Sequence, residues 1–141
     1  MFLDEEKMIV GLGVDITNIS RIDKILNKFG KRFKNRVFTR AENENASLRE
    51  NSTGYYANRW AVKEACFKAL GCGMGSGIGW KDIETNNSSS GRPQLTVSGA
   101  AKTRLKEIIP DGYSSKINLS ISDDHPFAQA VVIIEALPRN C

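Results

Sequence analysis

The sequence has little histidine, little cysteine and no long apolar stretch. A single histidine, His125, excludes a zinc site built from several histidines of one chain. The three cysteines are an odd number without CxxC spacing, which fits a reducing cytosol better than a disulfide framework. No apolar run approaches the roughly 20 residues that span a membrane, and the acidic segment 1–7 is too short for a signal peptide. We therefore expect a cytoplasmic protein without a membrane partner.

Length and composition predict one soluble domain, which we assign to residues 1–141. A chain of 141 residues is long enough for a real core. Its hydrophobic fraction of 40% and charged fraction of 26% are typical of globular proteins. Strand and helix patterns follow one another without regular βαβ alternation, and no repeat or linker interrupts them. The expected fold class is α+β.

The net charge of +4 conceals a basic segment at residues 21–40. This segment carries eight Lys and Arg side chains against a single acidic one, Asp23, whereas the rest of the chain is slightly acidic. Such a concentration favours an anionic partner, which could be nucleic acid, an acidic protein or a membrane surface. The alternative is a solvated helix face.

Hydrophobic periodicity and turn signals predict the order of the elements. A short buried strand covers residues 8–14 with Asp15 at its end, and a helix covers residues 18–29. Thr39 and Glu42 match a capping box that opens a second helix toward Arg49. Residues 51–54 are expected to be a loop. Further strands are expected at 80–85, 94–97, 116–122 and 128–136, and a helix at 98–109.

The most informative segment is a predicted helix at residues 58–71 that ends at Gly71. Residues three and four apart share a helix face, so Trp60 and Phe67 form an apolar side. Glu64 and Lys68 lie along a stripe of small side chains. They are either a working charged pair or an ordinary helix-stabilising pair, and spacing alone favours the ordinary pair because such pairs are common.

Two glycine-containing segments suggest nucleotide binding only weakly. Residues 11–13 lack the third glycine of a dinucleotide fingerprint, and residues 71–79 lack the Gly-Lys-Ser/Thr ending of a P-loop. The second segment either presents backbone N–H groups to a phosphate or is a flexible connector. Asp15 and Glu64, with a nearby lysine, would suit Mg²⁺ if the fold brings them together.

Four motifs in sequence resemble the holo-acyl-carrier-protein synthases, the small bacterial 4′-phosphopantetheinyl transferases. They are GLGVDI at 11–16, FTRAE at 38–42, RWAVKEACFKALG at 59–71 and LSISD at 119–123. Their order and spacing also agree, over residues 8–135. Each motif alone is weak, and the segment 64–69 is the most specific.

The resemblance implies transfer of 4′-phosphopantetheine from coenzyme A to a serine of apo-acyl carrier protein. The other product is adenosine 3′,5′-bisphosphate, the reaction requires Mg²⁺, and it belongs to fatty acid biosynthesis. Asp15 and Glu64 would be the metal ligands, and Lys68 would contact phosphate, so these three form the catalytic set. The implied fold is an antiparallel sheet with packed helices. The implied assembly is a homotrimer with active sites between subunits, in which Asp15 and Glu64 could face each other across an interface.

The resemblance also suggests binding residues. Arg21, Lys24 and Lys28 would dock the acidic carrier protein. The expected coenzyme A contacts are Arg59, Lys63, Gly73, Gly75 and Arg92.

Two positions depart from the family pattern. Asp123 stands at a position where several relatives carry histidine and where other branches of the family also carry aspartate. His125, two residues later, is expected to be a loop residue that does not take over the role of that histidine. Segment 1–7 is additional to the usual start.

Two other classes of protein fit parts of the sequence. A basic nucleic-acid-binding module would use residues 21–40 on phosphates, but aromatic residues are few there and no RNA-binding signature is present. An inactive homologue acting as an interaction protein would lack Asp15 or Glu64, and both are present. The transferase is therefore favoured, with no nucleic acid among its partners.

Overall fold

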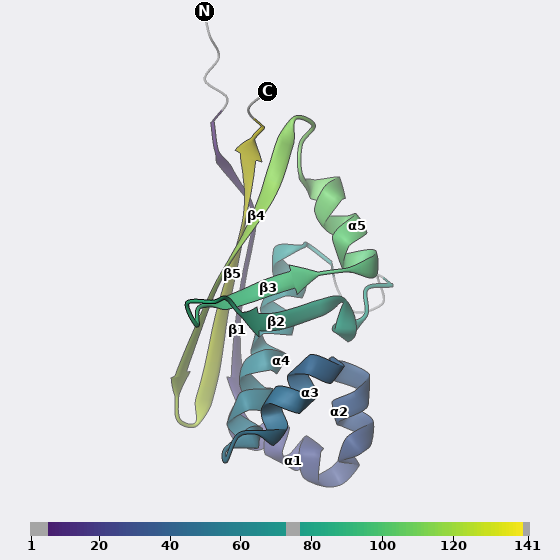
Figure 1. Ribbon diagram of the computed structural model, residues 1–141, viewed down its shortest axis with the longest axis vertical. Coiled ribbons are helices and arrows are strands. Elements are labelled where there is room, and N and C mark those ends of the chain that lie inside the picture. The colour runs from purple at the N-terminus through teal and green to yellow at the C-terminus, as the bar shows by residue number, and fades with distance from the viewer. Residues whose placement is uncertain (1–5, 73–76, 140–141) are drawn as a thin grey trace, which may run out of the picture.

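The computed structural model describes residues 6–72 and 77–139 and has the predicted α+β architecture (Figure 1). A three-stranded antiparallel sheet has the order β1 (Met8–Asn18), β5 (Phe127–Pro138), β4 (Tyr113–Asp124). A separate hairpin pairs β2 (Ile83–Asn87) with β3 (Pro93–Val97). The helices are α1 (Ile19–Phe29), α2 (Lys31–Val37), α3 (Arg40–Ser47), α4 (Ser52–Ala69), the 3₁₀ turn η1 (Trp80–Asp82) and α5 (Gly99–Ile108).

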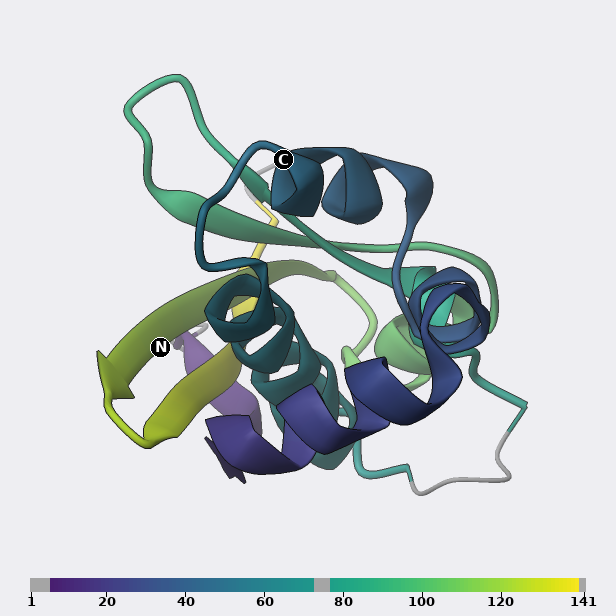
Figure 2. The same ribbon diagram turned by 90° about the horizontal axis from the view of Figure 1, so that it is seen from below.

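Helix α4 crosses one face of the three-stranded sheet, with α1, α2 and α3 gathered at one end of the molecule and α5 toward the other (Figures 1 and 2). Within the described residues, no helix is long and apolar enough to cross a membrane.

Local sequence signals account for several helix ends. The Asn18 side chain accepts a hydrogen bond from Ser20 N (2.9 Å) at the start of α1. The predicted capping box is present, since Thr39 Oγ1 accepts from Glu42 N (3.2 Å) and Glu42 Oε1 accepts from Thr39 N (3.0 Å). Gly71 has a φ of +68°, which suits glycine just past a helix end.

The structure corrects several of the expected elements. The strand expected at 80–85 begins only at Ile83, because Trp80–Asp82 form the 3₁₀ turn η1. Strand β1 continues to Asn18 because its pairing with β5 continues, so Asp15 lies inside the strand and not at its end. Helix α4 begins at Ser52, inside the expected loop, because the Asn51 side chain accepts from Gly54 N (3.0 Å) and caps it. Helix α2 was not predicted, because its seven residues carry only two large apolar side chains, Phe33 and Val37.

The predicted apolar side of α4 is confirmed. Trp60 stacks on Trp80 with ring centroids 4.6 Å apart, and Phe67 meets the Trp80 ring edge-on at 5.1 Å. The opposite side of α4 carries small residues that pack on the sheet, and Ala61 and Ala65 are completely buried there. The helix therefore has apolar contacts on both sides, as a central core helix does.

Two glycines in β1 let α4 approach the sheet unusually closely. A Cβ atom added to Gly13 would collide with the carbonyl oxygen of Ala65, and it would lie 2.8 Å from both Ala65 C and Ala69 N. A Cβ atom on Gly11 would collide with the carbonyl oxygen of Ala69. Both positions therefore need glycine for close backbone contact.

We predict that Gly13→Ala lowers the free energy of unfolding by about 3 kcal/mol, because the added methyl group meets backbone atoms that cannot rotate away. Urea unfolding measures the change. Gly79→Ala is the matched control: Gly79 has a negative φ, and an added Cβ would meet nothing closer than 3.9 Å. Its expected change is within about 0.5 kcal/mol. Equal stability of the two variants would contradict the close-contact explanation.

Candidate active site

Strand β1 and helix α4 bring Asp15, Glu64 and Lys68 together. Lys68 Nζ donates to the Val14 carbonyl oxygen (2.8 Å) and lies 3.4 Å from Asp15 Oδ1. The other oxygen of Asp15 accepts from Thr17 Oγ1 (2.6 Å), which holds this carboxylate in place. The ordinary helix pairing of Lys68 with Glu64 is absent among the described ion pairs, so Lys68 turns toward β1.

The Glu64 carboxyl is electrostatically coupled to the same group of residues. Burial raises the pKa of Glu64, and the Asp15 carboxylate raises it further, whereas Lys68 and Arg21 lower it. Because this coupling acts within one chain, Asp15 and Glu64 need no second subunit to meet. The expectation that they face each other across a subunit interface depends on the homotrimer and stays a prediction.

The donor set fits a hard divalent cation. Mg²⁺ is typically held by one or two carboxylates, with water and substrate phosphate oxygens completing its shell. Asp15 and Glu64 supply two carboxylates, and a cation between them would relieve their mutual repulsion. Within residues 6–72 and 77–139, no group of three or more His, Cys, Asp or Glu side chains is placed to hold a metal.

The predicted docking residues lie beside the carboxylates because α1 follows β1 directly. Arg21, in the first turn of α1, is close enough to Glu64 to lower its pKa. Lys24 and Lys28 follow at helical spacing, and all three side chains are exposed. A basic helix face thus borders the candidate active site.

Lys63 does not lie at a ligand-accessible surface, contrary to the expectation of a coenzyme A contact. Its side chain is 0% exposed and its Nζ lies 2.8 Å from Glu42 Oε1, which is also 0% exposed. The same ammonium donates to the carbonyl oxygens of Trp80 (3.0 Å) and Ile83. Burial lowers the pKa of Lys63, and Glu42 opposes that shift. Lys63 therefore joins α3, α4 and the start of β2 inside the core.

Arg59 does line a cleft, of about 620 Å³, at the N-terminal half of α4. Its guanidinium carbon lies 4.4 Å from the centre of the Tyr55 ring, and the residue is only 8% exposed. In the wall of the same cleft, Asn58 Nδ2 donates to Asp123 Oδ2 (2.9 Å) at the end of β4. Sequence reasoning missed Tyr55 and Asn58, although the i,i+4 spacing of Tyr55 and Arg59 was a visible signal.

Of the remaining predicted residues, the structure describes Arg92 and His125. Arg92 is exposed in the turn between β2 and β3, which projects from the body of the molecule (Figure 2). Gly73 and Gly75 lie outside the described residues. His125 is exposed in the turn between β4 and β5, as expected for a loop residue.

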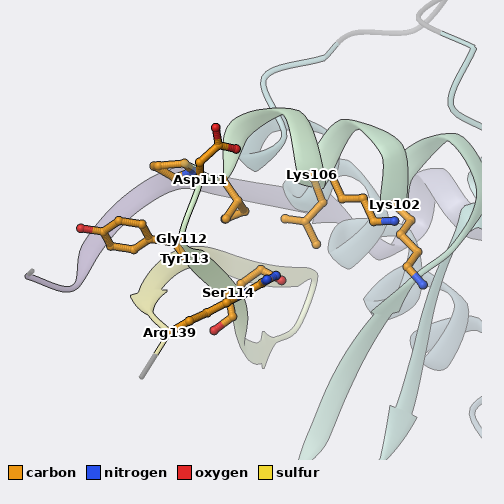
Figure 3. A pocket seen from close by; sticks show the side chains of 11 residues that line it. Lys102, Lys106, Asp111, Gly112, Tyr113, Ser114 and Arg139 are labelled. Atoms are coloured by element: carbon orange, nitrogen blue, oxygen red, sulfur yellow. The ribbon is translucent and has the colours of Figure 1, made fainter. Parts of the chain in front are cut away.

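A second hollow lies at the far end of the sheet and is separate from this site (Figure 3). It has a volume of about 410 Å³, and its walls include Lys102, Lys106 and Arg139. Tyr113, which also lies in its wall, is the β4 residue that lies opposite Pro138 of β5 in the sheet. Asp15 of β1 lies opposite Ala130 of the same strand. Eight residues of β5 separate these two positions, which corresponds to about 26 Å at ~3.3 Å per residue.

Paired carboxylates, a lysine and a buried arginine on an α+β scaffold suit an enzyme that transfers phosphate-bearing groups. Comparisons with known proteins agree with this class of enzyme. The family model described as the 4′-phosphopantetheinyl transferase superfamily matches residues 11–130. The chain therefore belongs to this superfamily, and it is a transferase.

Individual relatives are similar over most of their length. A holo-[acyl-carrier-protein] synthase of Ruegeria sp. (strain TM1040) is 52% identical over 131 residues, which cover 93% of this chain and 92% of the relative. The crystal structure of the synthase from Neisseria meningitidis has a TM-score of 0.79 at 31% identity and covers 90% of this chain and 98% of that one. The synthase from Bacillus anthracis, in complex with CoA (3′,5′-ADP), has a TM-score of 0.71 at 35% identity. The match covers 91% of this chain and 97% of that one.

Proposed function

We propose that this chain transfers 4′-phosphopantetheine from coenzyme A to a serine of apo-acyl carrier protein, releasing adenosine 3′,5′-bisphosphate. The proposal includes Mg²⁺ as cofactor and a cytoplasmic role in fatty acid biosynthesis. The observation that carries it is the meeting of Asp15, Glu64 and Lys68 in a chain about half identical to named synthases. The named relatives and the coenzyme A complex of a structural neighbour support the donor and acceptor.

The protein's own groups suit this reaction because most of the catalysis comes from positioning and electrostatics. Asp15 and Glu64 would hold Mg²⁺, which supplies charge neutralisation at the diphosphate of coenzyme A. The Lys68 side chain is 55% exposed while its ammonium is held beside Asp15, so it can reach a phosphate oxygen without leaving the site. Arg59 would bind a phosphate farther along the ligand.

The basic face of α1 would dock the carrier protein. Arg21, Lys24 and Lys28 are exposed, and α1 leads directly from the strand that carries Asp15. An acidic partner bound there would present its serine near the carboxylates. Charge complementarity of this kind mainly raises the association rate and weakens with salt.

The uncovered face of the sheet supports a homotrimer. Alternate residues of β1 point away from α4, and Leu12, Val14 and Ile16 are 60%, 43% and 63% exposed. They pair with β5 positions that include Val131 and Ile133, which makes a continuous apolar face. Copies of the same chain would cover it, because an exposed apolar patch of this kind marks an interface. A neighbouring subunit would then be needed to bring Arg92 to the ligand.

The test of the proposed activity is direct. Incubation with apo-acyl carrier protein, coenzyme A and Mg²⁺ should yield the phosphopantetheine adduct by mass spectrometry. Glu64→Gln should reduce the rate at least about 100-fold, because it removes one of two metal-binding carboxylates. Glu44→Gln, an exposed carboxylate on α3, is the control and should retain full activity. An adduct that forms equally with chelator present would contradict the mechanism.

Carrier docking is best tested at Lys24, because Arg21 also lowers the pKa of Glu64 and a change there would affect the active site itself. We expect Lys24→Glu to raise the KM for carrier protein roughly tenfold and to leave the KM for coenzyme A unchanged. Steady-state kinetics at low and high salt measure both values. Lys102→Glu, on the exposed side of α5, makes the same charge change away from α1. It should alter neither the KM for carrier protein nor the KM for coenzyme A. Parallel increases in both KM values would refute docking on α1.

The trimer is tested by the molar mass in solution. Light scattering should give three times the chain mass of 15.6 kDa for the wild type, and Ile16→Lys should give the single-chain mass. The lysine would place a charge on the shared apolar face, while Ile16 is already exposed in the single chain. Leu48→Lys is the control, since Leu48 is 83% exposed but lies outside the sheet. A single-chain mass for the wild type would exclude the assembly.

A further inference from the structure

Asp15 accepts a short hydrogen bond from the hydroxyl of Thr17. Thr17 Oγ1 lies 2.6 Å from Asp15 Oδ2, a length typical of a hydroxyl that donates to a charged carboxylate. The contact between Asp15 Oδ1 and Lys68 Nζ is longer, at 3.4 Å, and the shorter bond of that ammonium goes to the Val14 carbonyl oxygen at 2.8 Å. Thr17 therefore holds the Asp15 carboxylate more tightly than Lys68 does.

Thr17 is available for this contact because β1 runs past Asp15. Pairing with β5 continues through Thr17, which lies opposite Ala128, so the alternation of the strand is preserved. Residues two apart on a strand face the same side, and Asp15 and Thr17 therefore share the side of β1 on which Gly11 and Gly13 meet α4. Thr17 is 3% exposed, so water has little access to compete for its hydroxyl.

The carboxylate of an aspartate has no sharply preferred orientation of its own. The torsion between its Cβ and Cγ atoms is broad, in contrast to the staggered wells of an sp³–sp³ torsion. A partner on one oxygen therefore decides which way the other oxygen points. The Thr17 hydroxyl has a single proton, which is committed to Asp15 Oδ2, and this leaves Oδ1 on the side of Lys68 for a further cation.

We propose that Thr17 is a positioning residue for the metal site, whose hydroxyl fixes the Asp15 carboxylate so that Oδ1 is free to bind Mg²⁺ together with Glu64. This inference rests on the proposed function, because it takes Asp15 and Glu64 as the two metal-binding carboxylates. Removing a group that holds a metal ligand by a hydrogen bond typically costs roughly 10- to 100-fold in metal affinity. The role belongs to the Thr17 hydroxyl, whereas its methyl group contributes packing.

Thr85 on β2 provides a matched control. It is 2% exposed, much as Thr17 is, but its Oγ1 has no hydrogen-bond partner among the described residues. A change from threonine to valine removes the hydroxyl at either position and keeps a β-branched side chain of the same shape. Any effect that both valine variants share is therefore an effect on packing, and not on Asp15.

Titration calorimetry measures Mg²⁺ binding directly, with coenzyme A present and the carrier protein absent so that no product forms. Thr17→Val should weaken Mg²⁺ binding at least about tenfold, and in the activity assay it should raise the half-saturating Mg²⁺ concentration by a similar factor. Thr85→Val should bind Mg²⁺ as the wild type does. Its melting temperature should be unchanged or higher, because it loses an unsatisfied hydroxyl.

Two smaller substitutions separate the hydroxyl of Thr17 from its packing. Thr17→Ser keeps the hydroxyl and should retain most of the Mg²⁺ affinity, whereas Thr17→Ala should weaken Mg²⁺ binding as Thr17→Val does. Thermal unfolding without ligand shows that each variant is folded. Equal Mg²⁺ affinity of the folded serine and alanine variants would overturn this inference alone. A wild type that binds coenzyme A but no Mg²⁺, or that forms no phosphopantetheine adduct, would overturn the proposed function together with it.

Discussion

The close contact between α4 and β1 is the constraint on which the candidate active site depends. Gly11 and Gly13 leave room for the backbone of α4 at Ala65 and Ala69, where any side chain on β1 would collide. Because strand residues alternate between faces, the position two after Gly13 also faces the helix, and it is Asp15. The residues that precede each alanine on α4 are Glu64 and Lys68. One steric fit therefore determines which charged side chains meet.

A second interaction determines how α4 is held on its other side. Lys63 and Glu42 form a completely buried ion pair whose remaining hydrogen bonds go to backbone groups of η1, of β2 and of Thr39. Burying such charges is costly, and only a well-satisfied network offsets that cost. Adjacent residues on a helix point about 100° apart, so Lys63 can enter the core while Glu64 faces β1. Consecutive charges on one helix thus have unrelated roles.

Much of the fold followed from local sequence signals. The capping box at Thr39 and the apolar side of α4 appear as predicted, because caps and periodicity act over a few residues. The strands near both ends of the chain are also present, although β1 runs past its predicted end. Helix α2 and the true start of α4 were missed, because their ends depend on packing and on a single side-chain cap. The motif resemblance by itself indicated Asp15, Glu64 and Lys68 as the candidate site.

The sequence by itself determined the chemistry available to this protein: two carboxylates, a lysine, a basic helix and the α+β order of elements. Only the tertiary structure decided which charged residues are exposed and which are partners. It buried Lys63 against Glu42, turned Lys68 from Glu64 toward Asp15, and placed Arg49 and Arg59 on one tyrosine ring. The physical reason is that pairing and burial depend on long-range packing between segments such as β1 and α4, and residue spacing along one helix carries no record of that packing.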